Sequence, residues 1–138
     1  MAASALVDTG AIIAFLDPSD RWHRACVEAI AQIPLPLLTS EAVLTELFHL
    51  RGPRGYDRTW RFVRSAVSLA SMADEELPAI HSLMTQYADR PMDFADATLV
   101  YLANREGLST ILTIDHDDFE TYRLAGRKRF RILPTRRL

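Results

Sequence analysis

Two aspartates stand where the chain leaves a predicted strand. Asp8 follows the apolar run Ala5-Leu6-Val7, and Asp115 follows the β-branched run at 110–114. Parallel strands present their carboxyl ends at one edge of a sheet, where α/β proteins bind their ligands. The two carboxylates are therefore candidates for one shared site. A second interpretation stays open for Asp8, which is also a suitable cap for a helix that begins at Thr9.

Two further acids lie on predicted helices, at positions that favour burial. Glu46 has mostly apolar residues one turn away in both directions, so we expect its side chain to face inward or into a cleft. Asp96 begins the apolar stretch that continues through residues 97–103. Asp93, three residues earlier, is expected to be the N-cap of the same helix.

The chemistry implied by these four carboxylates is that of a divalent cation. If Asp8, Glu46, Asp96 and Asp115 converged, they would repel one another, and burial would raise their pKa values further. A hard cation bound through oxygen keeps such acids charged, whereas the cysteine and histidines show no zinc-ligand spacing. We therefore expect Mg²⁺ or Mn²⁺, and with it phosphoryl transfer or phosphodiester hydrolysis.

Short strands separated by helices are expected to position these acids. We predict strands at 5–7, 35–38, 110–114 and 130–133, and helices at 9–16, 21–32, 41–50, 56–72, 76–88 and 94–105. Ser40 is a good N-cap for the helix at 41–50, and Gly107 a stop signal for the helix at 94–105. The pattern predicts one α/β domain over residues 1–138 with a short, mostly parallel sheet.

Composition argues against several other classes of protein. The 138 residues are 49% hydrophobic and 25% charged, which is ordinary for a globular domain and argues against disorder. No uncharged run is long enough to span a bilayer. No Lys or Arg precedes Arg21, so the sequence lacks the basic start that is typical of a signal peptide. Cys26, the single cysteine, cannot form an internal disulfide. We expect a cytoplasmic protein with no membrane association.

Positive charge is gathered in two places. Residues 119–138 hold seven of the 16 basic residues and one of the 18 acidic residues. Arg54, Arg58 and Arg61 also share one face of the helix predicted at 56–72, with aromatic residues between them. Two interpretations remain open for this face: a surface that contacts RNA phosphates, or a solvated face above a buried aromatic stripe. His116, beside Asp115, is expected to be an exposed loop histidine.

Four segments in this order resemble the PIN-domain ribonucleases, most closely the VapC-type toxins. They are Asp8-Thr9-Gly10, residues 41–46 ending in Glu46, residues 91–97 and residues 112–119. The resemblance implies a three-layer α/β/α PIN domain and a metal-dependent endoribonuclease neutralised by a VapB-like antitoxin. It assigns catalysis to Asp8, Glu46, Asp96 and Asp115, the metal to Asp8, Asp96 and Asp115, and auxiliary roles to Thr9, Asp93 and Asp118. We further expect RNA contacts from Arg54, Arg58 and Arg61, and a homodimer.

Two rival functions have to be weighed. A non-catalytic PIN-like module that binds RNA or a protein is the first, and the complete set of four acids argues against it. A receiver-type or haloacid-type phosphoryl-transfer domain is the second, and it would need an adjacent acidic pair or a second aspartate where Gly10 stands. Gly10 also departs from the Ser or Ala more usual in the PIN family, which we expect to cost about 1 kcal/mol of helix propensity without touching the chemistry.

Overall fold

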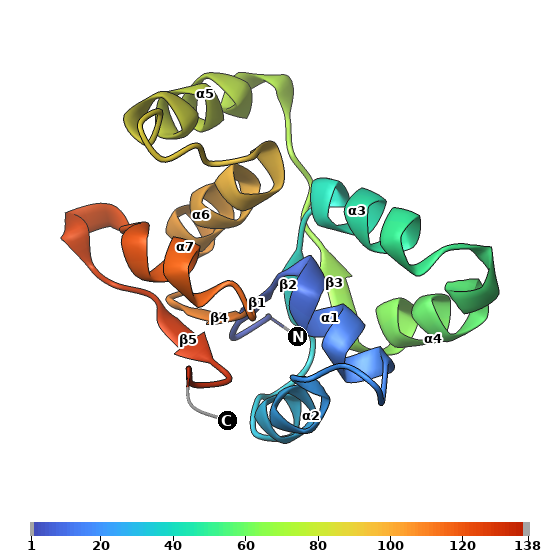
Figure 1. The fold of residues 1–138 in the computed structure, drawn as a ribbon. Helices are drawn as coiled ribbons and strands as arrows, with labels where there is room; N and C mark the ends of the chain where they lie inside the picture. The colour runs from blue at the N-terminus through green and yellow to red at the C-terminus, as the bar shows by residue number, and fades with distance from the viewer. Residues whose placement is uncertain (1, 137–138) are drawn as a thin grey trace.

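A parallel sheet of five short strands organises the computed structural model, which describes residues 2–136 (Figure 1). The strands are β1 (Leu6–Val7), β2 (Leu37–Thr39), β3 (Val67–Leu69), β4 (Thr110–Leu112) and β5 (Arg131–Leu133). Their order across the sheet is β3-β2-β1-β4-β5, and every pairing is parallel. The predicted parallel α/β architecture is therefore confirmed, with the first strand of the chain at the centre of the sheet.

Within residues 2–136, seven helices cover the sheet. They are α1 (Thr9–Leu16), α2 (His23–Ala31), α3 (Glu41–Arg51), α4 (Tyr56–Ala66), α5 (Leu77–Gln86), α6 (Phe94–Glu106) and α7 (His116–Thr121), with 3₁₀ turns at Pro53–Gly55, Asp74–Glu76 and Ala125–Arg127. Figure 1 shows α5, α6 and α7 on one side of the strands and α1, α2 and α4 on the other. The three layers expected from the resemblance are thus present.

The alternation of side chains along each strand supplies a core on both faces of the sheet. Leu6 and Ile111 belong to the apolar cluster formed with α5, α6 and α7. Their strand neighbours Val7 and Leu112 belong to the cluster formed with α1, α2 and α4. Because successive residues of a strand point to opposite faces, two-residue and three-residue strands are enough to anchor both layers.

One predicted helix is wrong at its C-terminal end. The helix expected over 56–72 ends at Ala66, and Val67–Leu69 form β3, which pairs with β2 from Leu37 to Thr39. The apolar spacing of residues 62–70 fits a helix. If residues 67–69 were helical, however, the backbone N–H and C=O groups at the edge of β2 would have no strand to pair with, so these residues form a strand instead. The short helix α7 was not predicted either.

No helix among residues 2–136 has the length and apolar character needed to cross a membrane.

Candidate metal centre

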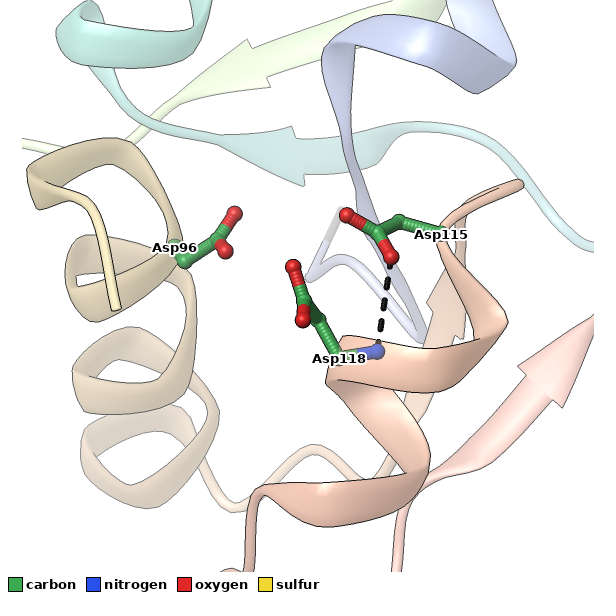
Figure 2. Close-up of side chains that lie close together, drawn as sticks. All are labelled: Asp96, Asp115 and Asp118. Atoms are coloured by element: carbon green, nitrogen blue, oxygen red, sulfur yellow. Dashed lines mark hydrogen bonds between the residues drawn. The ribbon is translucent and has the colours of Figure 1, made fainter. Parts of the chain in front are cut away.

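Three carboxylates gather at the carboxyl end of the sheet. Asp96, Asp115 and Asp118 each offer an oxygen within 4.8 Å of the other two. Figure 2 shows Asp96 reaching from the first turn of α6 toward the two acids at the start of α7. Asp115 is the N-cap of α7, and its Oδ1 accepts the backbone N–H of Asp118 at 3.3 Å. The cap that starts α7 therefore also turns Asp118, expected only as an auxiliary acid, into the group.

Asp8 stands beside these three acids and is linked to them by a hydroxyl. Thr113 donates a hydrogen bond to Asp8 Oδ2 at 3.0 Å and accepts the backbone N–H of Asp115 at 3.0 Å. The other oxygen of Asp8 accepts the N–H of Thr9 at 2.8 Å, so Asp8 is also the N-cap of α1. The capping role of Asp8 is therefore confirmed, and its position at the end of β1 also allows the role at the shared site, which stays a prediction.

The acids share one electrostatic environment. Burial is the main cause that raises the pKa of Asp8 to about 6, with smaller contributions from the charges of Glu46 and Asp115 and an opposing effect of the hydrogen bonds from Thr9 and Thr113. Burial also raises the pKa of Asp96 to about 8, with the charge of Asp8 as the next cause. Asp115 has a pKa of about 6, raised by burial and by Asp118. Negative charge in this cluster is therefore costly until a cation compensates it.

The remaining acids and the threonine expected at the site occupy flanking positions. Glu46 is half-buried on α3 and lies outside the three-carboxylate group, although its charge acts on Asp8. Asp93 is the exposed N-cap of α6 and accepts the N–H of Asp96 at 2.8 Å, as predicted. The Thr9 hydroxyl donates to the Val43 carbonyl at 3.4 Å, which joins α1 to α3.

Two residues that the sequence did not suggest contact the acids directly. The hydroxyl of Tyr122, a fully buried residue, donates to Asp96 Oδ2 at 2.8 Å. Burial raises the pKa of that phenol, so Tyr122 stays a neutral donor. Arg90, in the loop before α6, places Nη2 3.3 Å from Asp118 Oδ1. Neither contact has a local sequence signal, because each joins residues more than 25 positions apart.

Gly10 has a role that its helix propensity does not describe. A Cβ at this position would lie 2.9 Å from Cγ1 of Ile114, closer than real contacts allow. Ile114 immediately precedes Asp115, so a side chain at position 10 would press on the segment that leads to this acid. Packing therefore favours glycine at position 10 although helix propensity does not, and the expectation that Gly10 leaves the chemistry unaffected stays a prediction.

The structure does not bring the arginine face to the carboxylates. Arg58 and Arg61 are exposed on α4 and line a groove of about 350 Å³ with Phe15 and Leu16 at the C-terminal end of α1. Asp8 caps the opposite end of that helix. Arg54 lies in the exposed turn before α4. Contact of these arginines with RNA stays a prediction.

The donor set fits a hard divalent cation. Asp96, Asp115 and Asp118 offer carboxylate oxygens at a spacing that one ion can bridge, and no nitrogen or sulfur ligand belongs to the group. Oxygen-only sites of this kind suit Mg²⁺ and Mn²⁺ better than zinc or copper. A bound cation would also offset the repulsion that raises the pKa values of these acids.

Comparison with known proteins shows the family and the fold of this chain. A family model described as the PIN domain matches residues 5–125. The chain is 33% identical over 134 residues to Ribonuclease VapC26 of Mycobacterium tuberculosis, a match that covers 94% of this chain and 99% of that protein. The crystal structure of M. tuberculosis VapC20, described as a sarcin-ricin loop cleaving toxin, superposes with a TM-score of 0.70 and 22% identity. That superposition covers 78% of this chain and 87% of VapC20, and it shows the shared fold.

Proposed function

Because this chain belongs to the PIN-domain family and to its VapC-type ribonucleases, we propose that it is a metal-dependent endoribonuclease that hydrolyses RNA phosphodiester bonds. The observation that carries the proposal is the group formed by Asp96, Asp115 and Asp118 at the carboxyl end of the parallel sheet, with Asp8 beside it. Ligands of parallel α/β sheets bind at that edge.

Asp96, Asp115 and Asp118 are the residues that would hold Mg²⁺ or Mn²⁺, and Asp8 would complete the negative environment. When bound, such a cation polarises the phosphate and lowers the pKa of water. Asp8 is fixed through both oxygens by Thr9 and Thr113, so it cannot turn away from the site. The proposed catalytic set stays Asp8, Glu46, Asp96 and Asp115, and Asp118 takes the place among the metal ligands that was expected for Asp8.

Glu46 and Asp96 are the candidates for handling protons. Glu46 is half-buried beside Asp8 but outside the closest carboxylate group, which leaves it free to orient a water molecule. Asp96, whose pKa is raised to about 8, can hold a proton near neutral pH in the absence of a cation, and a cation bound to its carboxylate would favour loss of that proton. Asp96 therefore accepts a proton in the metal-free protein, whereas Glu46, outside the group of three carboxylates, stays available as a base when the cation is bound.

The test is the metal dependence of cleavage together with a binding measurement that needs no cleavage. Purified protein is incubated with RNA that contains the sarcin-ricin loop, first in EDTA and then with Mg²⁺ or Mn²⁺ restored. We expect cleavage to stop in chelator and to return with either ion. The thermal midpoint should rise with ion concentration, because the ion binds the folded state. Full cleavage activity in excess EDTA would exclude a metal-dependent mechanism.

We further propose that a VapB-like antitoxin neutralises the protein in the cytoplasm. The groove that contains Arg58 and Arg61 has apolar walls, and Trp60 is exposed on the same helix, α4, while Leu50 is exposed near the end of α3. An amphipathic helix or an extended segment would bury these residues. Expression of the chain alone should arrest growth, and co-expression with the antitoxin encoded beside it should restore growth. A folded Asp8→Asn variant that still arrests growth would contradict this scheme.

The homodimer is the remaining expectation of the proposal. Analytical ultracentrifugation of the purified chain should give the mass of two copies. A mass of one copy at micromolar concentration would mean that the protein works as a monomer or only in a complex with its antitoxin.

A further inference from the structure

A separate pocket adjoins the carboxylate group through a shared residue. The pocket has a volume of about 280 Å³, and Asp115 lines it while also belonging to the group of three acids. Its other lining residues are Arg21, Trp22, Ile114, His116, Asp117 and Arg136. They come from the segment that enters α2, from the start of α7 and from the chain that follows β5. A ligand in this pocket would lie next to whatever the carboxylates hold.

One wall of the pocket is aromatic and rigid. The half-buried ring of Trp22 has its centroid 5.1 Å from that of His116. His116 is buried, contrary to the expected exposed loop histidine, and its Nε2–H donates to the Pro134 carbonyl at 2.9 Å. The imidazole is therefore held in place and supports the indole. A fixed aromatic surface of this kind is what nucleic-acid-binding proteins use to stack bases.

The two arginines of the pocket differ in their partners. Arg136 is bound by the carboxylates of Asp117 at 2.6 Å and Glu120 at 2.5 Å. Arg21 is exposed, and none of the ion pairs found within residues 2–136 includes it. Its guanidinium carbon lies 5.7 Å from the centroid of the Trp22 ring. That interaction is weak at an exposed position, so Arg21 can turn to a phosphate at little cost.

We propose that this pocket binds the RNA nucleotide next to the cleaved bond, with its base packed against Trp22 and a phosphate in contact with Arg21. The inference rests on the proposed function, because Asp115 connects the pocket to the carboxylates that would hold the scissile phosphate. The volume lies just below the usual range for small-molecule sites, which suits one nucleotide better than a protein segment. Stacking on an indole accepts any base, so the pocket positions single-stranded RNA without selecting its sequence.

Trp22 itself provides the signal for a direct test. The chain has two tryptophans, so Trp60→Phe leaves Trp22 as the single tryptophan, which excitation at a wavelength that tyrosine does not absorb reports alone. Adding Asp8→Asn is expected to block cleavage and alters no residue of the pocket. This double variant is titrated with a single-stranded hexaribonucleotide in Mg²⁺, and separately with inorganic phosphate. We expect saturable quenching by the RNA and none by phosphate. RNA that binds by anisotropy without changing the fluorescence, or phosphate that quenches as well as RNA, would overturn the proposal.

Exposed arginines on either side of Trp22 provide a matched pair of variants. Arg21 lines the pocket, whereas Arg24, also exposed and near the start of α2, does not. Arg21→Gln should reduce the salt dependence of hexamer binding by about 0.7 in slope, the value of one phosphate contact on a single strand. Arg24→Gln should leave the slope unchanged, and equal slopes for the two variants would overturn the assignment.

The side chain of Trp22 is tested by substitution as well. Trp22→Ala should weaken hexamer binding about fivefold or more, and Trp22→Phe should keep most of the affinity. Far-UV circular dichroism and the thermal midpoint establish that each variant is folded. If a folded Trp22→Ala variant binds as tightly as the parent protein, the base does not pack in this pocket.

Failure of this inference can be distinguished from failure of the proposed function. If the wild-type protein cleaves RNA with Mn²⁺ but the Arg21 and Trp22 variants bind RNA as the parent does, the proposed function holds and the nucleotide site is wrong. If the protein cleaves no RNA but RNA changes the Trp22 fluorescence and Arg21→Gln lowers the salt dependence, the nucleotide site holds and the proposed function is wrong.

Discussion

The hydroxyl of Tyr122 donates a 2.8 Å hydrogen bond to Oδ2 of Asp96. The tyrosine ring packs edge-on against Tyr87 and Phe119, so the phenol oxygen has a fixed position in the core. Held in this way, the Asp96 carboxylate points toward Asp115 and Asp118, as Figure 2 shows. Tyr122 therefore acts on the proposed metal site through Asp96, without contacting the metal position itself.

Tyr122→Phe should weaken the binding of Mn²⁺ about tenfold, because outer residues that orient metal ligands contribute at least that much. Isothermal titration calorimetry on the variant and the parent measures the difference. Tyr87→Phe is the matched control, since its hydroxyl accepts the backbone N–H of Arg123 and makes no bond to Asp96. Equal decreases in affinity for the two variants would mean that any damaged tyrosine in this core disturbs the site.

Asp96→Asn and Asp8→Asn should each abolish cleavage and leave the fold intact. In the absence of metal, Asp96→Asn should also raise the free energy of unfolding by about 1 kcal/mol or more, because it removes a buried acid with a raised pKa. Cleavage assays and chemical denaturation in EDTA provide the two measurements. Asp89→Asn, at an exposed position in the loop before α6, should change neither. Full metal-dependent activity in Asp8→Asn or Asp96→Asn would show that the acid is not catalytic.

The metal-free protein should lose stability as the pH rises from about 5 to 8. Asp8 and Asp115 have pKa values of about 6 in the folded state, and Asp96 about 8, compared with about 3.9 for an unfolded aspartate. Across this range the folded state binds more protons than the unfolded state, so the free energy of unfolding falls with increasing pH. Thermal unfolding in EDTA at several pH values measures this slope.

Comparison with a variant isolates the contribution of one acid to that slope. Asp96→Asn should reduce the slope over the whole range and flatten it most between about pH 6 and 8, where Asp96 is the one acid of the three that still holds a proton in the folded state. Saturating Mn²⁺ should flatten the whole range in the wild-type protein, since a bound cation favours the charged carboxylates. Parallel curves for wild type and Asp96→Asn in EDTA would contradict the raised pKa of this acid.

The arginines around α4 provide a test of the second basic surface. If Arg54, Arg58 and Arg61 bind phosphates, replacing all three with glutamine should weaken RNA binding at low salt. The salt dependence should fall by about 0.7 in slope for each phosphate that the variant no longer binds. An unchanged slope, together with weaker binding of the antitoxin, would assign the groove to the protein partner and not to RNA.

Features that depend on neighbouring residues were predictable from the sequence. Ser40 caps α3, Asp93 caps α6, and Gly107 ends α6 with a left-handed φ of 68°. Each of these signals acts within one helical turn, where side-chain chemistry and backbone geometry decide the outcome. The sequence likewise predicted that Asp96 and Asp115 lie close together.

Features created by packing between distant segments were not predictable in the same way. The strand at Val67–Leu69 exists because β2 offers it an edge, although its apolar spacing also fits a helix. Asp118 joins the closest carboxylates because the Asp115 cap starts an unexpected helix at that point. Tyr122 and Arg90 reach the acids across the fold, so their roles required the three-dimensional structure.

The central place of β1 has a consequence for the synthesis of this protein. Its sheet partner β4 is more than 100 positions later in the chain, and the Thr113 hydroxyl that holds Asp8 is 105 positions away. During translation, the segment that contains Asp8 therefore emerges from the ribosome long before Asp115 and Asp118 have been added to the chain. Because interactions of such long range form late, the nascent chain carries no assembled carboxylate group. The proposed nuclease activity therefore cannot appear during translation until synthesis of the domain is almost complete.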